Sequence, residues 1–165
     1  MEEKIYKYIA NNIEEILISI AIAIMSCSVF LQILCRYILT EPLVFTEELS
    51  RYSYIWIASL SIALAAKKRS HLAINIFVKK MFSERSRVLL EILISMIAIV
   101  ILIVFIPQSI KYCIFVRPLI SPALRFSKLV IAISLPIGYA LAVIRFIVVL
   151  VEDIKKYKML KISKS

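Results

Sequence analysis

Few side chains in this sequence could carry out chemistry, and they stand apart from one another. The single histidine, His71, follows a Lys-Lys-Arg run, and the three cysteines include no Cys-x-x-Cys pair for thiol exchange. Haem ligation by two histidines of this chain is excluded, and no cysteine or carboxylate near His71 completes a metal site. We therefore expect no catalytic, cofactor-binding or metal-binding residue, and we expect His71 to organise its turn by hydrogen bonding.

Two ionisable residues, Glu91 and Arg145, lie at or within long apolar segments. We expect them to pair with each other near one membrane surface, which leaves a proton or substrate relay as the less favoured alternative. An ion-coupled carrier also needs interrupted helices or ionisable groups at mid-membrane. The only glycine, Gly138, stands near Pro136, which we expect to kink one helix, and this falls short of a pair of interrupted segments.

A set of charged residues surrounds a short turn that contains Pro42. Its charged members are Arg36, Glu47, Glu48 and Arg51. We expect a salt bridge from Glu48 to Arg36 to fix the two helices that meet at this turn. Trp56 follows on the second of these helices, where it is either a membrane-interface residue or a packing wedge, with the interface role preferred.

The elements that must position these residues are membrane spans. Hydrophobic residues make up 62% of the chain, charged residues make up 19%, and the mean hydropathy is +0.92. About 20 apolar residues of helix cross a bilayer core. Four segments qualify, over residues 16–38, 46–66, 88–110 and 129–151. The sequence therefore predicts an all-α integral membrane protein, with residues 1–165 forming a single four-helix membrane domain.

Charge placement predicts which side the termini occupy. In a soluble chain, a net charge of +10 would suggest nucleic-acid binding. The basic residues of this chain instead flank apolar runs, as in a membrane protein. With four crossings, 15 Lys and Arg residues fall on the side of the termini and 6 on the other, so we expect both termini in the cytoplasm. Mixed apolar and basic residues over 3–13 and 72–82 predict two amphipathic helices that lie on the membrane surface.

A series of local motifs then points to a known family. These are FLQILCRY (30–37), EELSRYSYIW (47–56), HLAIN (71–75), SPAL (121–124) and SLPIG (134–138). In order, spacing and four-span plan, this series resembles the small membrane subunit of tripartite ATP-independent periplasmic (TRAP) transporters, the DctQ-like family. The resemblance covers most of the chain.

The resemblance implies a scaffold role in the bacterial inner membrane. Such a subunit packs against a large permease subunit, which would hold the substrate and the sodium ions, and a periplasmic binding protein would deliver an organic acid such as a dicarboxylate or a sialic acid. No cofactor is expected in this chain, and its outer loops would help to dock the binding protein. The family often has aspartate where this chain has Asn75, so we expect no charge-dependent role there, and it commonly has glycine where this chain has Arg125, so we expect this turn to be built differently.

The residues alone leave two other functions open. One is a small, self-sufficient transporter or channel that works as a homo-oligomer, with Glu91 and Arg145 along its path. The other is a membrane redox enzyme, which the cysteine spacing and the solitary histidine oppose. We expect this chain to be a non-catalytic subunit that carries no substrate by itself.

Overall fold

A computed structural model of the protein describes residues 2–39, 43–68 and 84–162. These residues form long helices: α1 (Glu2–Leu34), η1 (Cys35–Leu39, a π-helix), α2 (Val44–Lys67), α4 (Glu84–Val116), α5 (Leu129–Ala132) and α6 (Ser134–Ile162). The predicted surface helix over 72–82 lies outside the described residues, as do His71 and Asn75.

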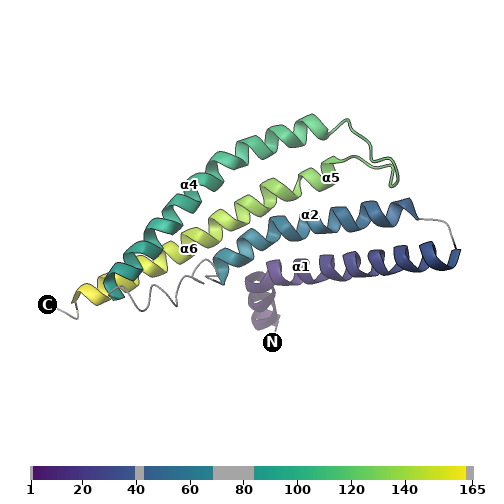
Figure 1. The fold of residues 1–165 in the computed structure, drawn as a ribbon. Helices are drawn as coiled ribbons and strands as arrows, with labels where there is room; N and C mark the ends of the chain where they lie inside the picture. Colours follow the sequence, from purple (N-terminus) through teal and green to yellow (C-terminus); the bar gives the residue numbers. More distant parts are fainter. Residues whose placement is uncertain (1, 40–42, 69–83, 163–165) are drawn as a thin grey trace.

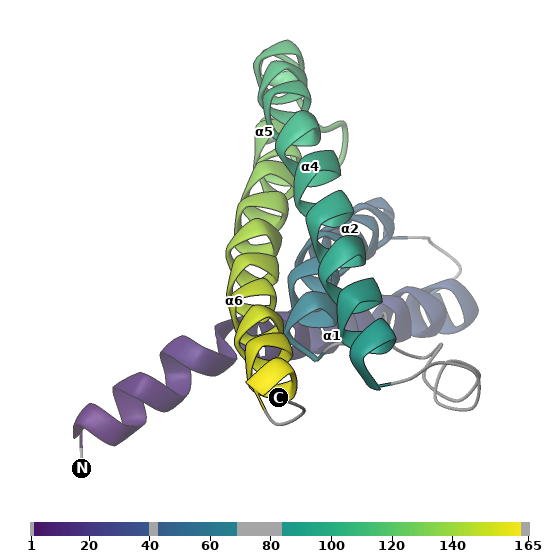
Figure 2. The same ribbon diagram turned by 90° about the vertical axis from the view of Figure 1, so that its left-hand side faces the viewer.

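The helices lie side by side in the order α1, α2, α6, α4 (Figure 1). The chain does not place them in sequence order, because α6 packs between α2 and α4. One end of the row carries the two connections over 35–43 and 117–128, which we call the loop end, and the other carries the C-terminus, which we call the terminal end. The first part of α1 turns away from the row, and the view in Figure 2 shows it pointing outward.

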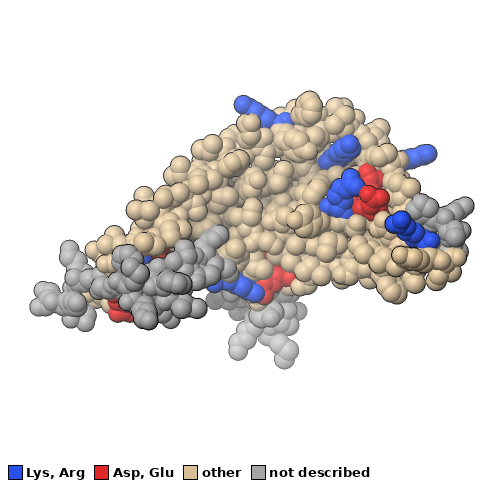
Figure 3. All heavy atoms as spheres, in the orientation of Figure 1, with Lys and Arg blue, Asp and Glu red and all other residues tan. Residues whose placement is uncertain are grey.

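Three helices are long and apolar enough to cross a membrane, judged by length and composition. They cover Asn12–Ile38, Ser86–Val116 and Leu129–Leu160. The predicted span at 46–66 is not among these three candidates, although it forms helix α2. Figure 3 shows on one face a wide belt free of charged side chains between the two ends of the row. The chain is therefore all-helical where described and has several apolar helices suited to a membrane.

The helices continue beyond the predicted spans into charged sequence. Helix α4 begins at Glu84 rather than at 88 and ends at Val116 rather than at 110, and α6 runs to Ile162 rather than to 151. The predictions were based on apolar residues, whereas a helix needs only internal hydrogen bonds and tolerates charged residues at its ends. The apolar runs thus mark the centres of the helices and underestimate their lengths.

The helices are interrupted at two places, one within α1 and one between α5 and α6. Asn12 has φ −117° and ψ 18°, which breaks the helical path of α1 between the predicted surface helix over 3–13 and the apolar segment. The helix is also divided near Pro136, where a kink was predicted: α5 ends at Ala132 and α6 starts at Ser134, while Ile133 between them keeps helical angles of φ −65° and ψ −19°. Proline has no N–H to donate to the carbonyl of Ala132, which weakens the helix at that turn.

Small residues form the contact between α2 and α6. On α2 the buried residues include Ser59, Ala63 and Ala66, and on α6 they are Ser134, Gly138 and Ala142. The hydroxyl groups of Ser59 and Ser134 lie 3.3 Å apart, and each hydroxyl also donates to a carbonyl of its own chain segment. Small side chains let helix backbones approach closely where lipid gives no hydrophobic reason to associate.

Candidate functional site

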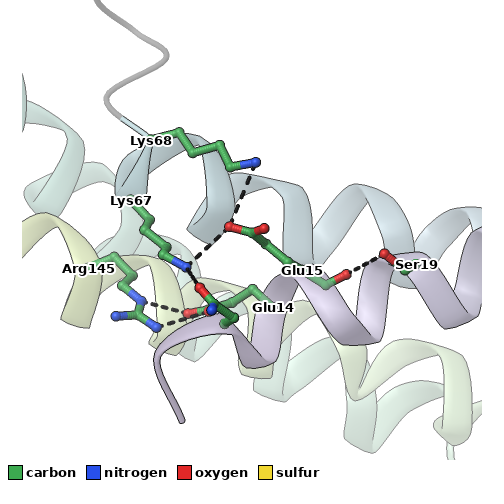
Figure 4. Close-up of polar contacts among 7 residues, drawn as sticks. Glu14, Glu15, Ser19, Lys67, Lys68 and Arg145 are labelled. Atoms are coloured by element: carbon green, nitrogen blue, oxygen red, sulfur yellow. Dashed lines mark hydrogen bonds and ion pairs between the residues drawn. The ribbon is translucent and has the colours of Figure 1, made fainter. Parts of the chain in front are cut away.

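A cluster of charged residues joins three helices at the terminal end. It contains Asn12, Glu14 and Glu15 of α1, Lys67 and Lys68 at the end of α2, and Arg145 of α6, and we call it the terminal cluster (Figure 4). Arg145 donates from Nε to Oε1 of Glu14 at 2.6 Å and from Nη2 to Oε2 at 2.9 Å. Glu14 is fully buried, and the Arg145 side chain is 19% exposed. This bidentate pair links α1 to α6, which lie on either side of α2 in the row.

The lysines of the terminal cluster hold the kink of α1. Lys67 Nζ donates to Oδ1 of Asn12 at 2.7 Å and to Oε1 of Glu15 at 3.2 Å. Lys68 Nζ lies 3.7 Å from the same Glu15 oxygen, and Figure 4 shows both lysines reaching toward it. Because Asn12 is the residue with non-helical angles, Lys67 stabilises the conformation at which α1 changes direction.

The predicted pair between Glu91 and Arg145 is wrong. Glu91 is 6% exposed, and it accepts a hydrogen bond at 3.2 Å from Nε of Arg87, one turn earlier on α4. Arg145 instead points from α6 toward Glu14 of α1. The sequence carried a signal for the true partner, since Glu14 and Glu15 stand directly before the charge-free run of the first span.

A second cluster forms at the loop end around Glu48, and we call it the loop cluster. Glu48 Oε2 accepts hydrogen bonds from the backbone N–H groups of Ala123 and Leu124, both at 3.0 Å, and Oε1 accepts from the hydroxyl of Tyr52. Ser121 is buried within the same turn, and its hydroxyl accepts from the N–H of Leu124. One carboxylate thus ties α2 to the connection between α4 and α5.

The predicted salt bridge from Glu48 to Arg36 is also wrong. Arg36 lies on η1 with an exposed side chain, while Glu47, the neighbour of Glu48, pairs with Arg51 at 2.8 Å on the surface of α2. Reasoning from opposite charges missed the partners of Glu48, because two of them are backbone N–H groups. Both N–H groups belong to the SPAL motif over 121–124. The sequence alone pointed to this motif but not to its role.

Arg125, which stands where the family commonly has glycine, adopts a glycine-like conformation. Its φ of 55° lies in the left-handed region, where a residue with a Cβ costs about 1–2 kcal/mol. The turn closes through the N–H of Arg125 bonding to the carbonyl of Ser121 at 3.1 Å and the N–H of Ser121 bonding to the carbonyl of Phe126 at 2.9 Å. Arginine therefore stands here in a conformation that glycine adopts without this cost.

Trp56 occupies a packing position. It is half-buried, and it lines an apolar groove of about 270 Å³ between α1, α2 and α5, together with Leu17, Tyr52 and Phe126. The Tyr52 and Phe126 rings meet edge to face, with centroids 6.1 Å apart. This location is compatible with the wedge role, and the preferred interface role stays a prediction.

Replacing Glu48 with alanine should loosen the connection over 117–128. The N–H groups of Ala123 and Leu124 would lose their charged acceptor, and their hydrogen exchange should become faster on the order of tenfold. Hydrogen-deuterium exchange mass spectrometry of the purified chain measures this change. Glu47→Ala is the matched control, since Glu47 contacts only Arg51 of its own helix. Equal exchange in both variants and the parent protein would show that Glu48 does not hold this loop.

The two clusters favour a structural role, in which they link helices, over catalysis or metal binding. Every buried side-chain nitrogen or oxygen among the described residues has a hydrogen-bond partner. Within the same residues, no three His, Cys, Asp or Glu side chains lie close enough together to hold a metal ion. Both carboxylate oxygens of Glu14, and both of Glu48, accept hydrogen bonds from other residues. Each cluster is built to fix one end of the helical row.

The known proteins that this chain resembles all belong to one type of membrane transport system. A family model described as "Tripartite ATP-independent periplasmic transporters, DctQ component" matches residues 25–156. The sialic acid TRAP transporter small permease protein SiaQ of Vibrio cholerae is 33% identical over 108 residues, which cover 62% of each chain. Two Haemophilus influenzae proteins, provisionally named TRAP transporter small permease proteins, are 38% identical over 71 residues and 30% identical over 103 residues. These matches cover 43% and 62% of this chain, and 44% and 61% of those relatives.

Proposed function

The chain belongs to the DctQ component family of tripartite ATP-independent periplasmic transporters, and we propose that it is a non-catalytic scaffold subunit supporting a much larger permease subunit. On this proposal the permease carries the substrate and the coupling sodium ions, and this chain holds no cofactor. A periplasmic binding protein delivers the substrate, and the connection over 117–128 helps to dock it.

One observation carries the proposal: four long stretches of the helical sequence contain no charged residue. No Asp, Glu, Lys or Arg lies between Glu15 and Arg36, between Arg51 and Lys67, between Glu91 and Lys111, or between Lys128 and Arg145. A substrate anion or a coupling ion crossing through this chain would need polar or ionisable groups near mid-membrane. The buried hydroxyl groups of Ser59 and Ser134 are engaged with each other and with backbone carbonyls. The middle of the row is thus suited to packing.

We further propose that α2 is a fourth span and that both termini are cytoplasmic in the bacterial inner membrane. Its 24 residues extend about 36 Å, enough for a bilayer core. It packs between α1 and α6, which are both candidate spans. The excess of basic residues on the side of the termini supports the orientation. The terminal cluster would then face the cytoplasm, and the loop cluster the periplasm.

The substrate is proposed only as a class. One relative is named for sialic acid, and organic acids such as dicarboxylates or sialic acids fit the proposed importer. The residues that choose among them are expected on the permease and the binding protein. Neither cluster offers an open cation for a carboxylate substrate, because the three cations of the terminal cluster pair with Glu14 or Glu15 and the residues named for the loop cluster include no cation.

Reconstitution tests the scaffold role. The purified chain in vesicles, with an inward sodium gradient and labelled sialic acid or succinate, should show no uptake above empty vesicles. The permease with its binding protein should need this chain for uptake, and adding it should restore transport. Sodium-driven uptake by the chain alone would instead establish the self-sufficient homo-oligomeric transporter.

A further inference from the structure

Two adjoining hollows form one groove beside α4 near the loop end. The first, of about 470 Å³, lies between α4 and the start of α6, and its walls include Phe105, Lys111 and Tyr139. The second, of about 330 Å³, reaches α2 and includes Lys128. Tyr112 and Leu135 line both hollows, so the two lie next to each other. We call the whole the α4–α5 groove.

The walls of the groove change in chemistry along its length. Toward mid-membrane they are apolar: the rings of Phe105 and Tyr139 lie with centroids 6.1 Å apart, and Leu135 lies between the hollows. Toward the loop end they carry two ammonium groups, Lys111 and Lys128. An apolar lining with a few converging polar groups is typical of a ligand pocket. This gradient fits a molecule with a long apolar part and an anionic head.

The two lysines lack a negative partner in the part of the chain that the structure describes. The structure gives neither ammonium a carboxylate within ion-pair distance, whereas the nearby Arg51 has Glu47. Lys128 is only half-exposed, and its backbone N–H is bonded to the carbonyl of Leu119 at 2.9 Å. A fixed cation at a membrane interface, without its counter-charge, favours an anion from the surroundings.

The length of the groove fits one leaflet of a bilayer. Phe105 and Phe115 at its two ends are ten residues apart on α4, or about 15 Å, which is half of a hydrocarbon core about 30 Å thick. An acyl chain that lies along the groove would therefore stay within one leaflet.

We propose that the α4–α5 groove binds one anionic glycerophospholipid, with its phosphate at Lys111 and Lys128 and an acyl chain along Phe105, Leu135 and Tyr139. The site needs only that the loop end lies at a membrane surface. It does not depend on the transport role or on which leaflet the loop end faces. Such a lipid would link α4 to the connection over 117–128, beside the turn that Glu48 holds.

Native mass spectrometry of the full chain in mild detergent tests the site. With phosphatidylglycerol and phosphatidylcholine added in turn, the chain should retain one phosphatidylglycerol in preference to phosphatidylcholine. Lys111→Gln should lower the affinity for phosphatidylglycerol about fivefold, and the double variant Lys111→Gln/Lys128→Gln about thirtyfold. The thermal stabilisation that phosphatidylglycerol gives the parent chain should disappear in the double variant.

The matched control removes two exposed cations of the same end that do not line the groove, as Arg36→Gln/Arg117→Gln. This control should retain phosphatidylglycerol as the parent chain does. An equal loss in the control would show a general attraction to the surface, and equal retention of both lipids by the parent chain would show no headgroup selection. Displacement of the lipid when the permease assembles with the chain would show that a protein covers the groove. Each of these results would overturn the proposal.

Discussion

Glu14→Gln should destabilise the protein by about 3–5 kcal/mol, because it removes the negative charge from a hydrogen-bonded ion pair that is largely buried. Both side chains are less than one-fifth exposed, so solvent screening removes little of this effect. The free energy of unfolding, measured in mixed micelles by far-ultraviolet circular dichroism, reports the loss. A replacement of both partners by apolar residues of similar size, Glu14→Met/Arg145→Met, should recover most of the stability.

Two further variants separate this pair from other ion pairs of the chain. Glu15→Gln removes a carboxylate that is 38% exposed and should cost less than about 1 kcal/mol. Glu91→Gln should add to Arg145→Met without coupling, because Glu91 contacts Arg87 and not Arg145. Strong coupling between Glu91 and Arg145, with none between Glu14 and Arg145, would contradict the pairing described here.

The positions of the helices could be predicted from the sequence because membrane spans depend on local composition. The charge-free runs before Arg36 and after Glu91 lie inside α1 and α4, and the interruption near Pro136 follows from the missing N–H of proline. The predicted span over residues 46–66 forms a helix, but its polar first turns keep it below the hydropathy of the other three. Its crossing of the membrane remains a proposal.

The partners of the charged residues could not be predicted because they depend on the lateral order of the helices. Helix α6 inserts between α2 and α4, and the Arg145 side chain on α6 is directed toward α1 rather than toward Glu91 of α4. Glu48 bonds to N–H groups 75 and 76 residues away, and such groups are identical in every residue type except proline. Opposite charge is therefore a weak guide to contacts when backbone groups and several helices compete for one carboxylate.

Gly138→Ala should destabilise the contact between α2 and α6 by about 1–3 kcal/mol, the range for overpacking a close contact. A Cβ built on Gly138 would lie 2.5 Å from the carbonyl oxygen of Ser59 and 2.8 Å from its carbonyl carbon. The nearest atoms belong to the backbone of α2, so no side-chain rotation relieves the clash and the two helices must separate. Gly138→Val should have a larger effect and lower the amount of assembled transporter in membranes.

The direction of the stability change in Gly138→Ala distinguishes the helix contact from helix propensity. In a helix with open space around it, glycine to alanine stabilises by about 1 kcal/mol through helix propensity, so a loss of stability can only come from the contact. Ala140→Val, at an exposed position two residues along α6, is the matched control and should change the unfolding free energy little. Adding Ser59→Ala should not rescue Gly138→Ala, because the clash with the carbonyl of residue 59 remains. A gain in stability for Gly138→Ala would mean that α2 and α6 do not approach as closely as the small residues Ser59, Ser134 and Ala142 allow.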